Sequence, residues 1–171
     1  MVPYDELRHE KDEFFKHESY SPLTVAQKKS FTSLQYFPPD PELRFEIPLE
    51  PYPNPEAIQM QTTTGDLRDF VRLGKVHFTV AEVPAELTVY MNADGYFLPF
   101  VDALAGKETY PAGRYLEPEP IGGGRFLIDF NLAYNPYCAY NDGWSCPLTP
   151  PENRLKVPIA AGEKIFHSEG S

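Results

Sequence analysis

Apolar and polar residues alternate along much of the chain between residues 43 and 131, which is the pattern of short β-strands. The clearest case is the stretch from Leu43 to Glu50, where every second residue is apolar and the residues between are charged or proline. A period of two places the apolar side chains on one face of a strand. Because Pro48 has no backbone donor, this strand is expected at the edge of its sheet.

Further short apolar segments follow, and residues typical of turns separate them. Turns are expected at Thr64-Gly65-Asp66, Gly74-Lys75, Asn92 to Gly95 and Gly122 to Gly124. The segments between them run over 58–62, 67–73, 76–80, 87–91, 96–100, 108–116 and 125–131, with a stiff proline linker at 51–55, and make about eight strands in all. Tight turns between them predict an antiparallel meander that forms an up-and-down barrel or a strongly curled sheet. No helix of crossover length separates them, which argues against a parallel α/β sheet.

Helical patterns occur near the start of the chain. A helix is predicted over Tyr4 to His17, with acidic residues in its first turn and Lys16 in its last, as the helix dipole favours. Thr24 and Gln27 have the spacing of a capping box, which begins a short helix ending near Ser30. The expected single domain therefore has a helical N-terminal segment (1–35), a β-meander (42–131) and an irregular segment (132–165), called the wrap below.

The wrap combines residues that prevent regular structure with residues that favour burial. Asn135-Pro136 and the prolines from Pro147 to Pro151 interrupt any strand ladder, because proline removes a backbone donor. The same segment is too rich in tyrosine, tryptophan and leucine for a solvated loop. We therefore predict an ordered wrap over one end of the β-structure. Its backbone polar groups would be satisfied by asparagine side chains, those of Asn131, Asn135, Asn141 and Asn153.

Charge and composition exclude several classes of function. The formal net charge is -10, with no basic cluster, which disfavours binding to nucleic acid or to anionic lipid. No run approaches the roughly 20 apolar residues that a membrane helix needs, and the N-terminus lacks a signal-peptide pattern. We expect a cytoplasmic protein with no membrane association. The 19 prolines are about twice the usual roughly 5%, which favours strand ends and fixed loops.

The two cysteines, Cys138 and Cys146, lie too far apart for a zinc knuckle, and the four histidines lie outside residues 125–164. We therefore expect neither a metal nor a cofactor. A nucleophilic cysteine needs a base, and His77 on a strand is one candidate in space. The alternative, which we favour, is two small buried side chains. The sequence leaves open whether the thiols are paired.

Charged residues on two expected strands suggest a binding site. Glu108, Tyr110 and Arg114 share one face of their segment, and Asp129 and Asn131 share a face of the last strand. If these strands pair across Gly122 to Gly124, Arg114 approaches Asp129. One interpretation is a structural salt bridge from Arg114 to Glu108 or Asp129. The other is that Arg114 binds an anionic group of a ligand.

Three functions are compatible with these features. The first is binding of a small molecule, with an anionic group as one option, by Arg114, Glu108, Tyr110, Asp129, Asn131, Asn135, Tyr140 and Trp144. The second is a hydrolase-like enzyme in the same pocket, with Glu108 or Asp129 as acid or base. The third is a structural or protein-interaction module, which predicts an exposed apolar patch and a homodimer.

Four sequence stretches resemble one known family. They are SLQYFPPDPELRFE at 33–46, GKETYPAGRYL at 106–116, DFNLAYNPYCAYN at 129–141 and WSCPLTPPENRLKVPIAAGEK at 144–164. Together they resemble the bacterial and archaeal domain-of-unknown-function family 1684, in the right order and over most of the chain. That family has no established activity, so the resemblance marks where its signature lies and implies no catalytic role.

Overall fold

The computed structural model describes residues 2–166 and consists mainly of antiparallel β-strands with two α-helices near the N-terminus. The helices are α1 (Tyr4–His17) and α2 (Val25–Ser30). The strands are β1 (Arg44–Pro48), β2 (Glu50–Gln61), β3 (Leu67–Val80), β4 (Val83–Asn92), β5 (Gly95–Phe100), β6 (Arg114–Leu116), β7 (Glu119–Gly122) and β8 (Arg125–Asp129). Short 3-10 turns are η1 (Pro41–Leu43), η2 (Phe130–Leu132), η3 (Tyr137–Ala139) and η4 (Pro151–Asn153). No helix of the described chain is long and apolar enough to cross a membrane.

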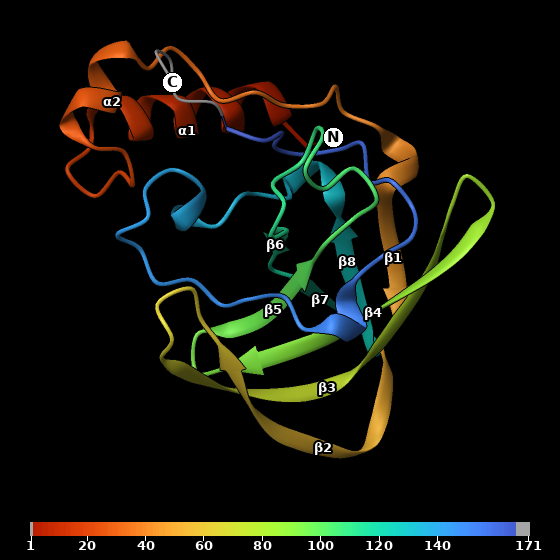
Figure 1. Cartoon of the computed structure of the whole chain (residues 1–171). Helices are drawn as coiled ribbons and strands as arrows, with labels where there is room; N and C mark the ends of the chain where they lie inside the picture. The colour runs from red at the N-terminus through yellow and green to blue at the C-terminus, as the bar shows by residue number, and fades with distance from the viewer. Residues whose placement is uncertain (1, 167–171) are drawn as a thin grey trace.

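Strands β2 to β6 form the larger sheet, in which each strand pairs antiparallel with the next along the chain (Figure 1). This is the predicted meander. Gly74 does not form the turn expected of it, because β3 continues through it with a bulge between Arg72 and Gly74. A Cβ at Gly74 would lie 2.3 Å from the carbonyl oxygen of Glu50. Glycine is needed here for the close approach of β2, not for a chain reversal.

The remaining strands form a second sheet in the order β1, β8, β7. The pairing of β1 with β8 joins segments far apart in the sequence, since Phe45 of β1 lies opposite Ile128 of β8. The expected position of β1 at an edge is confirmed. The two sheets pack against each other through aromatic side chains. The ring of Phe45 lies 5.2 Å from that of Phe78 in β3, and Phe130 contacts both.

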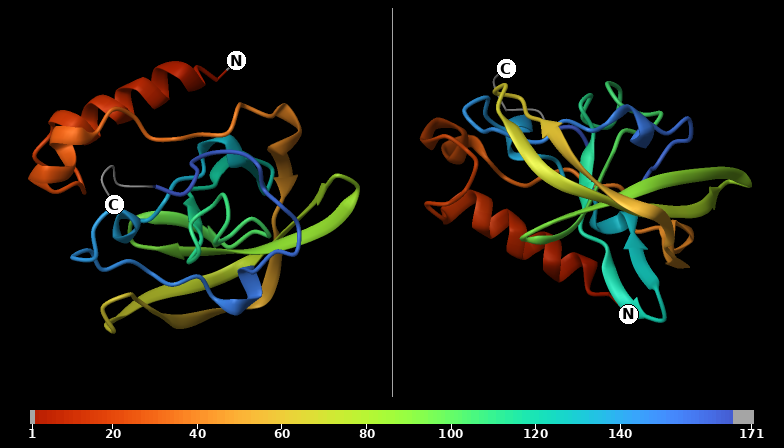
Figure 2. Two further views of the ribbon diagram at one scale, coloured as in Figure 1. Left: turned by 45° about the horizontal axis from the view of Figure 1, so that its top comes forward. Right: turned by 90° about the horizontal axis from the view of Figure 1, so that it is seen from below.

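The two helices lie on one side of the sheets and cover the wrap (Figure 2). Both have the predicted bounds, and the capping box of Thr24 and Gln27 is present, with the Gln27 N–H donating to Thr24 Oγ1 over 3.1 Å. An apolar cluster separate from the main core joins α1 and the residues flanking α2 to the wrap. In that cluster the ring of Phe15 lies 5.0 Å from that of Tyr140. Helix α1 is therefore held by burial against the wrap. Helix α2 has no buried residue, and the side chain of its Gln27 donates to the Tyr140 carbonyl over 2.7 Å.

The wrap is irregular, and single β-bridges connect it to the strands and to the segment before β1. The bridges pair Tyr115 with Tyr134, Thr62 with Pro147, Val101 with Arg154, and Tyr36 with Glu163. The prediction that asparagine side chains satisfy its backbone is confirmed for Asn135 and Asn141, whose side chains bond to the Lys164 carbonyl and the Gly143 N–H. The side chain of Asn153 instead binds strand backbone: it accepts from Thr88 N–H and donates to the carbonyls of Thr88 and Pro99 at 2.8–2.9 Å. The side chain of Asn131 bonds to the backbone of Asp40, before β1.

Several expectations about the strands were wrong. The strands lie in two sheets and do not close into a single barrel in residues 2–166. Segment 51–55 is not a linker, because it belongs to β2, where an irregularity in register between Pro51 and Glu56 accommodates the prolines. Segment 108–116 is a strand only over Arg114–Leu116, since turns occupy the residues before it. No strand was predicted where β7 lies, just before the expected turn at Gly122 to Gly124.

Candidate functional site

Arg114 is the largest fully buried side chain, with 1% of its surface exposed, and its contacts are structural. Its guanidinium donates to the carbonyl of Glu163 over 3.0 Å, to that of Ile159 over 2.9 Å and to that of Ala161. Its Nη2 lies 3.8 Å from Asp102 Oδ1. Burial lowers the pKa of Arg114 to about 10, so the guanidinium stays charged at neutral pH. Arg114 therefore joins the end of the wrap to β6.

The expected approach of Arg114 to Asp129 or Glu108 is wrong. Strand β6 pairs with β5, and β8 pairs with β1 and β7, so Arg114 and Asp129 lie on different sheets. Asp129 instead accepts from the Tyr4 hydroxyl over 2.6 Å and from the backbone and side-chain nitrogens of Asn131. Glu108 is exposed.

Asn135 and Tyr140 meet at a buried carboxylate that the sequence analysis missed. Glu163 is 2% exposed and accepts from the Tyr140 hydroxyl over 2.6 Å and from the Asn135 N–H over 3.0 Å. It also forms an ion pair with Lys11 of α1. Burial raises the pKa of Tyr140 well above its usual range, so the hydroxyl remains a donor. This cluster joins α1 to the wrap.

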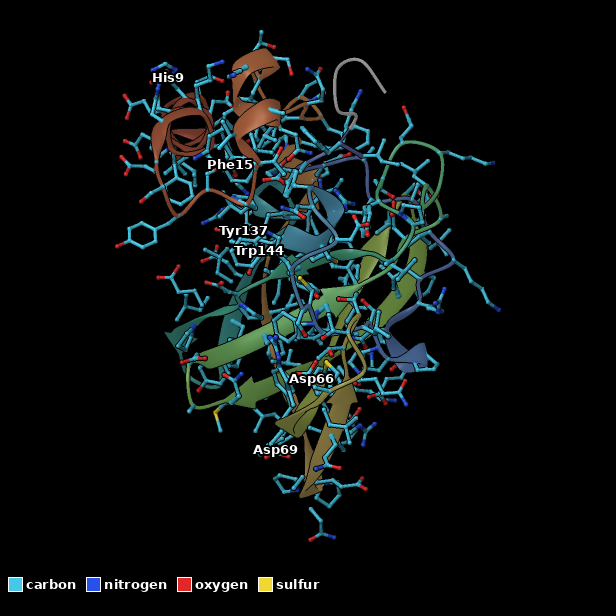
Figure 3. The ribbon with its side chains drawn as sticks, turned by 60° about the vertical axis from the view of Figure 1, so that its left-hand side comes forward. His9, Phe15, Asp66, Asp69, Tyr137 and Trp144 are labelled. Atoms are coloured by element: carbon cyan, nitrogen blue, oxygen red, sulfur yellow. The ribbon has the colours of Figure 1, made fainter. Side chains whose placement is uncertain are left out.

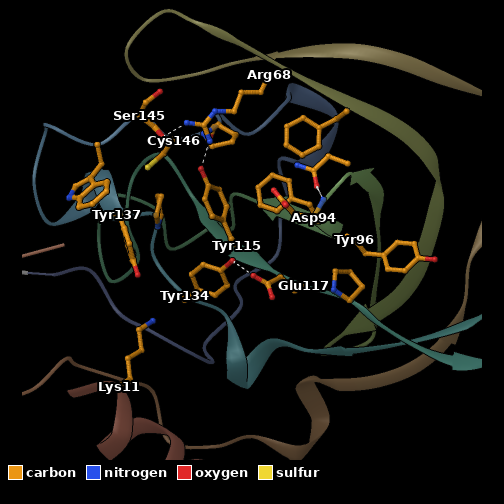
Figure 4. Close-up of a pocket in the computed structure, with 18 of the residues that line it drawn as sticks. Lys11, Arg68, Asp94, Tyr96, Tyr115, Glu117, Tyr134, Tyr137, Ser145 and Cys146 are labelled. Carbon is orange, nitrogen blue, oxygen red and sulfur yellow. Dashed lines mark hydrogen bonds between the residues drawn. The ribbon is translucent and has the colours of Figure 1, made fainter. Parts of the chain in front are cut away.

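A pocket with a volume of about 790 Å³ lies between α1, the five-stranded sheet and the wrap (Figure 4). Of the eight predicted site residues, Trp144 alone lines it. Aromatic side chains form much of its wall. They are Phe14 and Phe15 of α1, Phe70 of β3, Tyr96 and Phe97 of β5, Tyr115 of β6, and Tyr134, Tyr137 and Trp144 of the wrap.

Polar and charged side chains also line this pocket. The Tyr115 hydroxyl donates to the carbonyl of Pro147, and the Tyr134 hydroxyl donates to Glu117 over 2.8 Å. Burial raises the pKa of both tyrosines above the usual range, so they line the pocket as neutral phenols. Arg68 of β3 donates through Nη2 to the Ser145 carbonyl over 2.6 Å, and within residues 2–166 its other donors have no protein acceptor. Asp94 and Glu117 supply the negative charges.

Contacts with both helices and the β2–β3 turn hold the wrap in place at this pocket. Figure 3 shows Phe15, Tyr137 and Trp144 in succession from α1 towards the sheet, with Asp66 in the β2–β3 turn beyond them. The indole N–H of Trp144 donates to the Pro22 carbonyl over 3.2 Å, and its ring packs edge-on against Tyr137 at 5.2 Å. The Ser145 hydroxyl donates to Asp66 over 2.9 Å.

Both cysteines lie beside this pocket as free thiols. Cys146 lines the pocket, and its sulfur accepts from the Cys138 N–H over 3.3 Å. Tyr110, another predicted site residue, lies behind them with its hydroxyl 3.9 Å from the Cys138 sulfur. His77, the candidate base, bonds instead to exposed Glu50 over 2.7 Å. The structure thus brings the two cysteines together, and no histidine within residues 2–166 hydrogen-bonds to either thiol.

Comparisons with known proteins agree on one family. Residues 29–164 match the family model described as "Protein of unknown function (DUF1684)". A similar solved structure is the solution NMR structure of the uncharacterized protein from gene locus rrnAC0354 of Haloarcula marismortui. It shares 34% sequence identity, covers 94% of this chain and 91% of its own, and superposes with a TM-score of 0.71. A search of curated proteins finds no match.

Proposed function

This chain belongs to the family of proteins of unknown function DUF1684, and we propose that it binds a small aromatic molecule carrying an anionic group in the pocket beside Trp144. The observation that carries the proposal is the size and lining of this pocket. A volume of about 790 Å³ falls in the range of roughly 300–1,000 Å³ that small-molecule sites occupy. Such sites are mostly apolar, with a few polar groups that fix orientation.

The aromatic lining supports a flat apolar ligand. Rings on α1, β3, β5, β6 and the wrap face the same space, and aromatic pairs prefer stacked or edge-to-face contact at about 4.5–7 Å between centroids. The ring of Tyr115 packs in this way against Phe97 at 4.8 Å and against Tyr134 at 5.9 Å. The wall is therefore packed before a ligand arrives, which lowers the entropic cost of binding.

The anionic group is inferred from Arg68. Its guanidinium has donors beyond the one that bonds to Ser145, and its planar fork matches a carboxylate, sulfonate or phosphate. Lys11, the other cation that lines the pocket, is paired with Glu163. Arg68 thus takes the role that the sequence analysis gave to Arg114.

Binding can be measured with 8-anilinonaphthalene-1-sulfonate, an aromatic anion, through the fluorescence of Trp144, the only tryptophan. We expect saturable quenching with a dissociation constant in the micromolar range, about 8 kcal/mol of binding free energy. The Arg68→Ala variant should bind this probe about 10-fold more weakly, because a charged hydrogen bond is lost. N-phenyl-1-naphthylamine, which lacks the sulfonate, should bind both forms equally.

The matched control is Arg154→Ala, which removes an exposed arginine that does not line the pocket. It should leave the affinity for both probes unchanged. Non-saturable quenching of the wild type by both probes would remove the binding proposal. Saturable binding that is insensitive to Arg68→Ala would contradict the proposal that the ligand carries an anionic group, but not the proposal that the pocket binds an aromatic molecule.

A further inference from the structure

Cys138 and Cys146 lie at the two ends of a loop of the wrap that carries one wall of the pocket. Cys138 belongs to η3, and Cys146 follows Trp144 and Ser145. The 3.3 Å bond from the Cys138 N–H to the Cys146 sulfur places that sulfur against the backbone of its partner. Because a cysteine Cβ is only two bonds from its own backbone nitrogen, this contact also places the Cys146 sulfur near the Cys138 side chain, as formation of a disulfide requires.

The surroundings of the two thiols shift their pKa values in opposite directions. The pKa of Cys146 is lowered to about 6, mainly because the Cys138 side chain hydrogen-bonds to it, and also because of the backbone N–H groups of Cys138 and Tyr137 and the charge of Arg68. Burial acts in the opposite direction. The pKa of Cys138 is raised above the usual range by its contact with Cys146 and by burial. At neutral pH the thiolate is therefore on Cys146 and the proton on Cys138.

The two cysteines face different surroundings, although Cys138 is half-buried and Cys146 is buried. Cys146 is 6% exposed and lines the pocket, so a small neutral molecule that enters the pocket lies beside it. Cys138 does not line the pocket, and its sulfur faces the hydroxyl of Tyr110. A thiolate reached from solvent beside a second thiol is the arrangement of a peroxide-sensitive cysteine with its resolving partner.

We propose that Cys146 and Cys138 form a hydroperoxide-reactive pair, in which Cys146 is oxidised first and Cys138 resolves it to an intramolecular disulfide. In the first step the Cys146 thiolate attacks one peroxide oxygen and the O–O bond breaks. This gives a sulfenic acid on Cys146 and releases an alcohol, or water from hydrogen peroxide, after proton uptake from solvent. In the second step the Cys138 sulfur attacks Cys146, and the leaving hydroxide takes the Cys138 proton as water.

The disulfide would cross-link residues 138 and 146 and constrain the loop between them. That loop carries Trp144, and its first residue follows Tyr137, so oxidation acts directly on the pocket wall. One hydroperoxide is consumed for each disulfide, and a dithiol reductant would restore the thiols by exchange. The proposal does not depend on which ligand the pocket binds.

The first test treats the reduced full-length protein with a few equivalents of hydrogen peroxide and follows it by intact mass and peptide mapping. The wild type should lose two hydrogen masses and give a single cross-linked peptide pair, 138 with 146. Cys138→Ser should stop at a sulfenic acid on Cys146, which dimedone traps. Cys146→Ser should keep a free Cys138 at the same dose. Circular dichroism of each variant confirms folding.

The second test needs no variant and follows alkylation of the wild type by iodoacetamide from pH 5 to pH 9. Labelling of Cys146 should rise about 10-fold between pH 5 and pH 7 and then level off, whereas a thiol with an ordinary pKa of about 8.5 keeps rising. The groups that face the pair and shape this profile are Tyr110, Tyr115 and Arg68.

Two results would overturn the proposal. One is a wild type whose thiols both stay free, or are oxidised beyond sulfenic acid without a disulfide, at the dose that oxidises free cysteine. The other is Cys146→Ser reacting with peroxide as fast as the wild type, which would assign the reactive thiol to Cys138. Labelling of Cys146 that rises steadily to pH 9 would show that Cys146 is a protonated thiol at neutral pH, which contradicts the first step.

Discussion

Replacing Arg114 with methionine is expected to lower the free energy of unfolding by about 3–5 kcal/mol, the range for removing one partner from a buried charged network. Methionine fills much of the same volume but donates no hydrogen bond. The carbonyls of Ile159, Ala161 and Glu163 would then lose a buried donor, and the carboxylate of Asp102 would lose its ion pair. Urea unfolding followed by circular dichroism and by Trp144 fluorescence measures the change.

Two further variants separate charge from packing at this position. Arg114→Lys keeps a positive charge but cannot reach three carbonyls at once, so about half of the loss is expected. Arg154→Met, at an exposed arginine, should stay within about 0.5 kcal/mol of the wild type. A loss below about 1 kcal/mol in Arg114→Met would mean that the end of the wrap is held by apolar burial and not by this arginine.

Local signals predicted the elements that depend on neighbouring residues. The dipole-matched charges of α1 and the Thr24–Gln27 capping box each act within a few residues, and both helices have the expected bounds. Period-two alternation identified β1 and β8 for the same reason. These features follow from backbone geometry and do not require knowledge of the fold.

Features that depend on distant contacts could not be predicted. Nothing around Gly74 distinguishes a turn from a bulge, because the β2 backbone that it admits lies more than 20 residues away in sequence. The pairing of β1 with β8 joins the two ends of the meander and determines that there are two sheets. Alternation fixes which face of a strand is apolar but not which strand lies beside it.

The candidate site shows the same limit. A buried arginine that binds a ligand and one that binds backbone carbonyls have the same sequence pattern, and the carbonyls of residues 159–163 carry no side-chain signal. Arg68 lies on a strand among other charged residues and becomes part of a pocket only when the wrap reaches β3. Trp144, which was predicted to bind a ligand, lines this pocket, but the sequence could not identify the residues that face it.

The wrap has two roles that the structure links. Its later half, held by Arg114 and Asn153, covers the core between the sheets. Its earlier half supplies Tyr134, Tyr137 and Trp144 to the pocket. Because Glu163 at the end of the wrap bonds to Tyr140 in its earlier half and to Lys11 of α1, stability and pocket shape depend on the same residue.

Replacing Glu163 with leucine is accordingly expected to lower the free energy of unfolding by about 2–4 kcal/mol and to loosen α1. The Tyr140 hydroxyl and the Asn135 N–H would lose their acceptor, and Lys11 would lose its ion pair. Because Lys11 is part-exposed, water can solvate its ammonium group after the ion pair is lost. The expected loss in the free energy of unfolding is therefore smaller than that for Arg114. Hydrogen exchange should show earlier loss of protection in residues 4–17 than in β3 or β4.

Two glutamine variants test whether stability depends on the buried acceptor oxygens of Glu163 or on negative charge near α1. Glu163→Gln keeps a carbonyl oxygen for Tyr140 or Asn135 and should cost about 1–2 kcal/mol. Glu10→Gln removes an exposed carboxylate from α1 itself and should stay within about 0.5 kcal/mol of the wild type. If α1 exchanged equally fast in Glu163→Leu and in Glu10→Gln, the helix would be held by Phe15 and its apolar neighbours alone. Because Lys11, Phe14 and Phe15 line the pocket, loosened exchange should be accompanied by weaker binding of the aromatic probe.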